Sequence, residues 1–154
     1  MRRDIEKITQ DLNIASTDFN SLGIYEDWHK IEEKIYNTFC QIDHPKSRPI
    51  WLWEYFKLDT YSLSIKNPYQ MLEQLVNPNE EIWFFLNGDR DKFWFYQGKI
   101  TAITKVISES SYIDEIYLVS KKYDWLICIN HHDTLIATGK SMATRLKNIA
   151  AARS

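Results

Sequence analysis

The sequence predicts an α+β fold: a mainly antiparallel sheet of about five to six strands, with N-terminal helices and a C-terminal helix packed on it. Three observations predict this class. Apolar residues recur at helical spacing near the start, short apolar runs alternate with polar turns in the second half, and helical spacing returns at the end. The 154 residues are expected to form one domain, with a helical part at 1–45, a sheet with inserted helices at 49–139 and a final helix at 141–153.

Two helices are predicted in the N-terminal part. In the first, Ile5, Ile8 and Leu12 recur at helical spacing between charged residues. A polar break, "STDFNSLG", follows it. The second helix is expected from about residue 24 to residue 40, and it ends before "DHPKSRP" because two closely spaced prolines cannot continue a helix.

The next two segments read as a strand and a short helix. "PIWLWEYF" at 49–56 alternates in period two and is rich in aromatic residues, which is typical of a strand. "NPYQMLEQLVNP" carries helix boundaries in its own sequence. Asn67 is a candidate cap, Pro68 suits the first turn, and a second Asn-Pro pair closes the helix.

Two aromatic strands are predicted at about 81–86 and 92–96, around the turn sequence "NGDRD". The following stretch, "KITAITKVISES", is compatible with two structures. Ile100, Ile103 and Ile107 fit a helical stripe, whereas the β-branched content suits a strand. The stripe favours a helix.

Three short apolar runs, "EIYLVS", "WLICIN" and "TLIATG", are separated by "KKYD" and "HHD". This spacing predicts an antiparallel meander. A closing helix follows, with Met142, Leu146 and Ile149 on one face.

Composition restricts the function. Six Trp, nine Tyr and seven Phe predict a core of large rings, or else rings left at a surface for a partner. A net charge of −2 argues against a general nucleic-acid binder. No signal peptide or membrane-length apolar run is present, so a cytoplasmic location is expected. Cys40 and Cys128 lie in apolar stretches and are expected to be buried free thiols.

The segment Asn130-His131-His132-Asp133 is the strongest candidate for chemistry. It can be a metal site, an acid–base site that uses His131, His132 and Asp133, or a polar turn between two core strands. Neighbouring side chains on a strand point to opposite faces, which opposes metal binding if the strand continues through the histidines. CxxC, HExxH and EF-hand spacings and the nucleotide-binding motifs are absent, so no metal and no cofactor are expected. The polar turn is the favoured interpretation.

A protein-binding surface is the other class of site that the sequence indicates. "SKKYDWL" either keeps a hairpin in solution or presents a cluster of charged and aromatic residues to a partner. Acidic residues of the second helix could face a basic partner. The partner-binding candidates are Glu26, Asp27, Glu32, Glu33, Lys121, Lys122, Tyr123 and Trp125.

The segments "WLWEYFK", "EIWFFLNGDRDKFWFYQG" and "EIYLVSKKYDWLICINHHDTLIATG" resemble a family of small uncharacterised bacterial proteins over about residues 50–139. Such domains are similar in size and strand pattern to immunity proteins of polymorphic toxin systems, including the SUKH superfamily. We therefore expect a non-enzymatic cytoplasmic domain that binds a protein partner, most concretely an immunity protein that neutralises a bacterial toxin, and we expect no nucleic-acid or membrane partner. The alternative is a small metal-dependent or acid–base enzyme that uses the His131–Asp133 loop.

Overall fold

The computed structural model describes residues 2–22, 26–42, 51–87, 93–110 and 113–153. These residues form a seven-stranded sheet in the order β1-β4-β3-β5-β6-β7-β2, in which every neighbouring pair is antiparallel. The predicted α+β class is confirmed, and the sheet has more strands than the five to six expected. The strands are β1 (Phe19–Ser21), β2 (Thr60–Ser64), β3 (Glu81–Asn87), β4 (Phe93–Lys99), β5 (Ile116–Ser120), β6 (Leu126–Ile129) and β7 (Thr134–Thr138).

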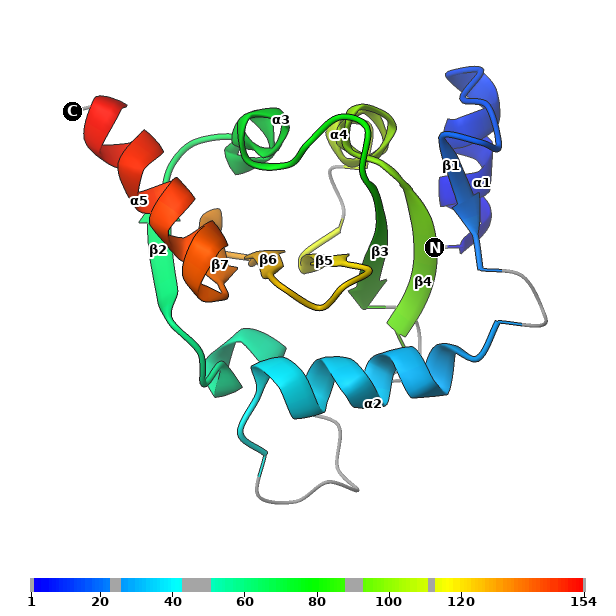
Figure 1. Ribbon diagram of the computed structural model, residues 1–154. Helices are drawn as coiled ribbons and strands as arrows, with labels where there is room; N and C mark the ends of the chain where they lie inside the picture. Colours follow the sequence, from blue (N-terminus) through cyan, green and yellow to red (C-terminus); the bar gives the residue numbers. More distant parts are fainter. Residues whose placement is uncertain (1, 23–25, 43–50, 88–92, 111–112, 154) are drawn as a thin grey trace.

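Helices cover both faces of the sheet. Figure 1 shows α3 and α4 on one side of the sheet and α2 on the opposite side; α5 lies beside β2 and β7, and α1 contacts α4. Among the described residues, none of the helices combines the length and the apolar character needed to cross a membrane. The helices are α1 (Arg2–Asp11), α2 (Trp28–Phe39), α3 (Leu72–Leu75), α4 (Ile100–Ser108) and α5 (Lys140–Arg153), and the 3₁₀ helices are η1 (Leu52–Tyr55) and η2 (Pro68–Met71).

The two edge strands were not predicted. β1 has three residues inside the polar break, and Phe19 is its one buried side chain. β2 alternates between exposed and half-buried residues, so its apolar face is narrow. They pair with β4 and β7 respectively. Short, polar edge strands carry little hydrophobic pattern of their own, and their partners provide the hydrogen bonds that define them.

The strand predicted at 49–56 is wrong for the residues that the structure describes. Leu52–Tyr55 form the 3₁₀ helix η1, with Leu52 fully buried, and residues 49–50 lie outside the described part. The physical reason is the return of the chain to the end of α2. Phe56 pairs with Cys40, and Lys57 N donates to Phe39 O at 2.9 Å. Tertiary pairing therefore overrides the local strand pattern.

The other helices agree with the sequence in type and differ at their boundaries. The second helix begins at Trp28. Asp27 is its N-cap residue, because Asp27 Oδ1 accepts a hydrogen bond from Lys30 N at 3.2 Å, and residues 23–25 lie outside the described part. The short helix at 68–75 starts with Pro68, as predicted. The capping role of the Asn67 side chain is wrong, because Asn67 has a φ of 52° and its side chain makes no capping hydrogen bond.

The second half follows the prediction closely. The ambiguous stretch is the helix α4, whose isoleucine stripe is buried against the sheet. The aromatic strands are β3 and β4, and the residues 88–92 that contain most of the "NGDRD" turn lie outside the described part. The meander is β5, β6 and β7.

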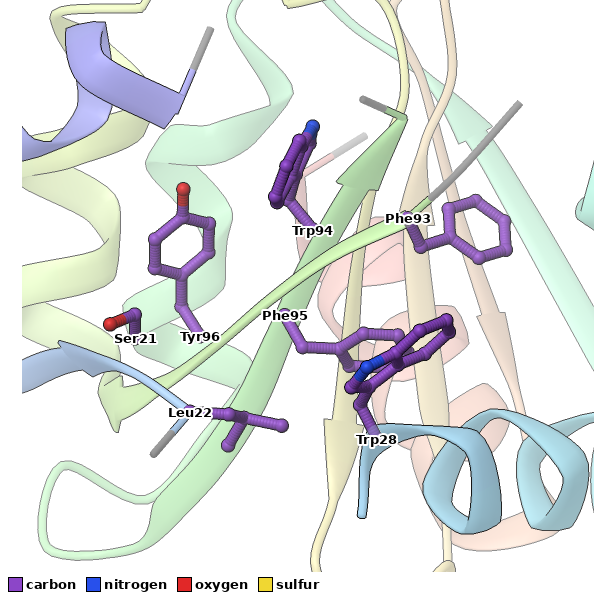
Figure 2. A pocket seen from close by; sticks show the side chains of 7 residues that line it. All are labelled: Ser21, Leu22, Trp28, Phe93, Trp94, Phe95 and Tyr96. Atoms are coloured by element: carbon purple, nitrogen blue, oxygen red, sulfur yellow. The ribbon is translucent and has the colours of Figure 1, made fainter. Parts of the chain in front are cut away.

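The aromatic strand faces form the core of the protein. On the α2 side of the sheet, Phe85 stacks on Phe95 and Tyr117, with ring centroids 4.9 Å apart in each pair. On the other side, Tyr96 stacks on Phe19 at 5.3 Å. Figure 2 shows the same alternation along β4, where Trp94 and Tyr96 point away from the side that holds Phe93, Phe95 and Trp28. The large rings therefore stabilise the fold.

Candidate functional site

The histidine segment is the turn between β6 and β7. The Asn130 side chain builds it, because its Oδ1 accepts from the backbone N of His132 at 3.0 Å and of Thr134 at 3.1 Å. Asp133 has a φ of 55°, a left-handed conformation that Asp tolerates. The strand ends before His131, so the rings of His131 and His132 lie side by side, with centroids 3.9 Å apart. The predicted hairpin turn is confirmed, and the rule of opposite faces does not apply within it.

A buried carboxylate holds the first of these histidines. Glu115 immediately precedes β5, and its side chain is 2% exposed. Its Oε1 lies 2.6 Å from His131 Nδ1 and accepts from the His131 backbone N at 3.3 Å. Its Oε2 accepts a weak hydrogen bond from Cys128 Sγ at 3.8 Å. Both carboxylate oxygens are thus partnered, as a buried charge requires.

The thiol next to Glu115 is not a nucleophile. Burial and the charge of Glu115 raise the pKa of Cys128 well above 9.0. A protonated thiol donates to Glu115 and is a poor attacking group. Burial also raises the pKa of Tyr117, whose hydroxyl lies near the thiol without a hydrogen bond of good geometry to any described residue. As predicted, Cys40 and Cys128 are free and buried.

An exposed ring covers the outer side of this pair. The Trp51 ring centroid lies 5.1 Å from that of His131, and Trp51 is 38% exposed. His131 has a 28% exposed side chain, so it connects the buried Glu115 to the surface. Trp51, His131 and His132 are called the Trp51–His surface below. Its rings are positioned by contacts that extend into the core.

A pocket of about 360 Å³ lies next to this turn. It is bounded by η2, by the end of α4 and by the ends of β5 and β6. Its lining combines isoleucine side chains with hydroxyl, amide, imidazole and carboxylate groups. The lining residues are Asn67, Pro68, Tyr69, Ile107, Ser108, Ser110, Ile113, Asp114, Ile116, Ile129, Asn130, His131 and Asp133.

Two other hollows have a different character. One, of about 100 Å³, lies between Trp28 and the aromatic residues Phe93–Tyr96, where Figure 2 shows rings on both sides of β4. It is a small gap in the aromatic packing. The other is a wide depression around the start of α5, where Lys140 and Arg145 lie near Asp124. Arg145 Nη1 is engaged there, because it donates to Leu75 O at 2.6 Å.

Two of the partner-binding candidates lie in the interior. Trp125 is 6% exposed and packs in the core cluster on the α4 side of the sheet. Glu32 is 7% exposed, and its Oε1 accepts from Tyr36 OH at 2.6 Å. Asp27 is exposed but caps α2. Glu26 and Glu33 are the remaining acidic candidates, and both are exposed.

The "SKKYDWL" turn also makes contacts within the protein. Lys121 Nζ lies 2.7 Å from Glu81 Oε1 and donates to Gln97 Oε1 at 2.8 Å. Tyr123 packs its ring against Trp83, with centroids 5.3 Å apart, and burial raises the pKa of Tyr123. Lys122 is exposed. The structure does not bring this turn together with the histidine turn into one site.

The described residues contain no group of three or more His, Cys, Asp or Glu side chains that could hold a metal ion. Sequence reasoning missed Glu115 and the placement of Trp51. A signal for Glu115 was present. It stands next to the mostly apolar run "IYLVS", all five residues of which are buried, and the register that pairs Ile116 with Ile129 places residue 115 opposite Asn130, one position before His131.

The fold and the site together define an α+β protein that carries a buried carboxylate–imidazole pair at a hairpin turn. The chain belongs to the family described as "Family of unknown function (DUF6756)", whose model matches residues 1–150. No curated protein matches the chain.

Proposed function

We propose that this protein is a non-enzymatic cytoplasmic domain that binds a protein partner through the Trp51–His surface. Its most concrete form is an immunity protein that neutralises a bacterial toxin. The observation that carries the proposal is the exposed Trp51 ring against His131, which in turn is held by the buried Glu115.

Preorganised aromatic rings suit protein recognition. Tryptophan is enriched among the residues that dominate interface energies, and its truncation at such positions costs about 2 kcal/mol or more. Ring contacts that already exist in the free protein reduce the entropy lost on binding. Tyr55 and Leu58, which are 40% and 39% exposed, add apolar surface on the segment that carries Trp51.

The acidic candidates supply a separate contact. Glu26 and Asp27 lie just before the first residue of α2, whereas η1 directly precedes Phe56, which pairs with Cys40 at the other end of α2. The two ends of this helix of 12 residues are about 18 Å apart. Lys30 and Lys34 alternate with the acids, so α2 has a mixed charge. We assign the acids a role in orienting a basic partner and Trp51 the larger share of the affinity.

Affinity capture from a lysate of the native host tests this function. The wild-type protein is expected to retain a partner that the Trp51→Ala variant loses and that the Leu12→Ala variant keeps. Leu12 is a matched control, because it is also 38% exposed and directly follows α1, where its backbone N donates to Ile8 O. Expression of the captured partner in bacterial cells then tests whether the partner is a toxin. Coexpression of the wild-type protein should restore the growth of these cells, and coexpression of Trp51→Ala should not. A partner retained equally by all three proteins contradicts the proposed surface.

A second function, acid–base catalysis, is favoured by the 2.6 Å contact between Glu115 Oε1 and His131 Nδ1. A carboxylate in this position orients an imidazole and stabilises its protonated form, which is the arrangement of many general bases. If the protein catalyses a reaction, the turnover number (kcat) of that reaction should fall about 100-fold or more in His131→Ala and should stay unchanged in His132→Ala. Equal rates in the two variants contradict it.

A further inference from the structure

The pocket of about 360 Å³ is not used by the proposed recognition surface, apart from the shared His131. Its volume falls within the range of small-molecule sites. Four isoleucines, Ile107, Ile113, Ile116 and Ile129, provide apolar lining. This part of the lining suits an aliphatic group.

The polar lining is rich in acceptors and carries negative charge. Asp114 and Asp133, both exposed residues, are the acidic members of the lining, and no Lys or Arg lines the pocket within the described part of the chain. Ser108 Oγ donates to Lys105 O at 2.8 Å, and Ser110 Oγ donates to Val106 O at 2.6 Å. Each hydroxyl hydrogen is thus already used, and the oxygen lone pairs are what these serines can offer to a ligand.

His131 adds a further acceptor. In the neutral imidazole, the contact with the Glu115 carboxylate places the hydrogen on Nδ1, because an ionised carboxylate can only accept. The other ring nitrogen, Nε2, then has a free lone pair. In the protonated imidazole, the buried carboxylate balances the added charge. With Asp114 and Asp133 ionised, the pocket lining therefore remains negative in either state of His131.

We propose that this pocket binds an organic cation, namely an ammonium or guanidinium group on a short alkyl stem. Asp114 and Asp133 are the counter-charges, the serine oxygens accept hydrogen bonds from the cation, and the isoleucines contact the stem. The same chemistry is found in a free alkylamine and in the side chain of a lysine or arginine that a protein partner presents. Binding of a cation in this pocket does not depend on whether the Trp51–His surface binds a protein partner.

Titration of isotope-labelled protein by NMR tests the site. The probes are n-butylammonium chloride, Nα-acetyl-lysine amide, n-butanol and sodium butyrate. We expect saturable shifts of the Ile107 and Ile129 methyl groups with butylammonium, at a dissociation constant of about 1–10 mM for so small a ligand. Butanol and butyrate are expected to bind at least about tenfold more weakly, and added salt should weaken the binding of the cation. Saturation by the lysine amide as well shows that the pocket accepts a peptide side chain, and saturation by butylammonium alone identifies a free amine as its ligand.

Three variants complete the test. Asp114→Asn and Asp133→Asn should each weaken butylammonium binding about three- to fivefold, and Asn tolerates the left-handed backbone at position 133. Asp11→Asn on α1 removes the same charge away from the pocket and should leave binding unchanged. Thermal melts of all three variants establish that they are folded. The proposal is overturned if butanol binds as tightly as butylammonium, if no saturable shift occurs at these methyl groups, or if the two pocket variants behave like Asp11→Asn.

Discussion

Replacement of His131 by alanine should destabilise the protein far more than replacement of His132. His131→Ala removes the side chain 2.6 Å from a Glu115 carboxylate that is 2% exposed. Loss of one partner of a fully buried ion pair costs about 3–5 kcal/mol. Two features reduce this cost: Cys128 Sγ and the His131 backbone N continue to donate to Glu115, and the imidazole is 28% exposed, so water can replace it. We therefore expect a loss of about 2–3 kcal/mol in the free energy of unfolding.

His132→Ala is the matched control. Within the described residues, the His132 side chain makes no hydrogen bond, and its backbone N keeps its bond to Asn130 Oδ1. Its loss should cost about 0.5 kcal/mol or less, as for most exposed positions. Urea denaturation at neutral pH measures both values, and unchanged m-values would show that the unfolded states are comparable.

A double-mutant cycle isolates the interaction itself. Glu115→Gln keeps the shape of the side chain but replaces a charged acceptor by a neutral one. The coupling energy between His131→Ala and Glu115→Gln should be about 1 kcal/mol or more. If the two histidine variants are equally stable, or if the coupling is zero, Glu115 does not hold His131 and the account of the site is refuted.

Three further outcomes are expected. Burial raises the pKa of Cys40 from 9.0 to about 12, so the unfolded chain loses this proton first. The contribution of Cys40 to stability should be complete below about pH 9 and should fall by up to about 1.4 kcal/mol per pH unit between about pH 9 and pH 12, so the fall measured in urea titrations should be shallower for Cys40→Ala than for the wild type. Neither Cys40 nor Cys128 should react with a thiol reagent at pH 8 until urea unfolds the protein, because both are buried; fast labelling would contradict their placement. Gly139→Ala should cost about 2–4 kcal/mol in thermal or urea unfolding, because Gly139 has a φ of 100° and a Cβ there would lie 2.5 Å from Asp124 O; a neutral effect would contradict the tight passage from β7 to α5.

The predictable parts of the fold are those with a strong pattern of their own. The meander β5–β7 and the aromatic strands β3 and β4 have long apolar runs separated by polar turns. The helix α4 was identified from the isoleucine stripe, which the structure buries. In these segments, local pattern and tertiary environment agree.

The missed parts depend on contacts between distant residues. The edge strand β2 becomes a strand through its pairing with β7, whose residues are 70 to 78 positions away. The segment 51–56 alternates as a strand does, yet most of it forms a 3₁₀ helix. It pairs with the end of α2 through the single bridge between Phe56 and Cys40. Local pattern contains neither constraint.

The candidate site shows the same limit. The sequence identified the histidine turn, because Asn130 and Asp133 are turn formers and the flanking runs are apolar. It did not identify the buried partner, because Glu115 is 16 positions away from His131 and reaches it through the pairing of β5 with β6. The strand register connects the two residues, and a register is a property of the folded sheet.

The central claim is that the Trp51–His surface binds a protein partner. The dissociation constant of the purified partner, measured for the wild type, Trp51→Ala and the equally exposed Leu12→Ala, tests this claim most directly. We expect Trp51→Ala to bind at least about 30-fold more weakly than the wild type, and Leu12→Ala to bind as tightly as the wild type. Equal dissociation constants for the wild type and Trp51→Ala would contradict it.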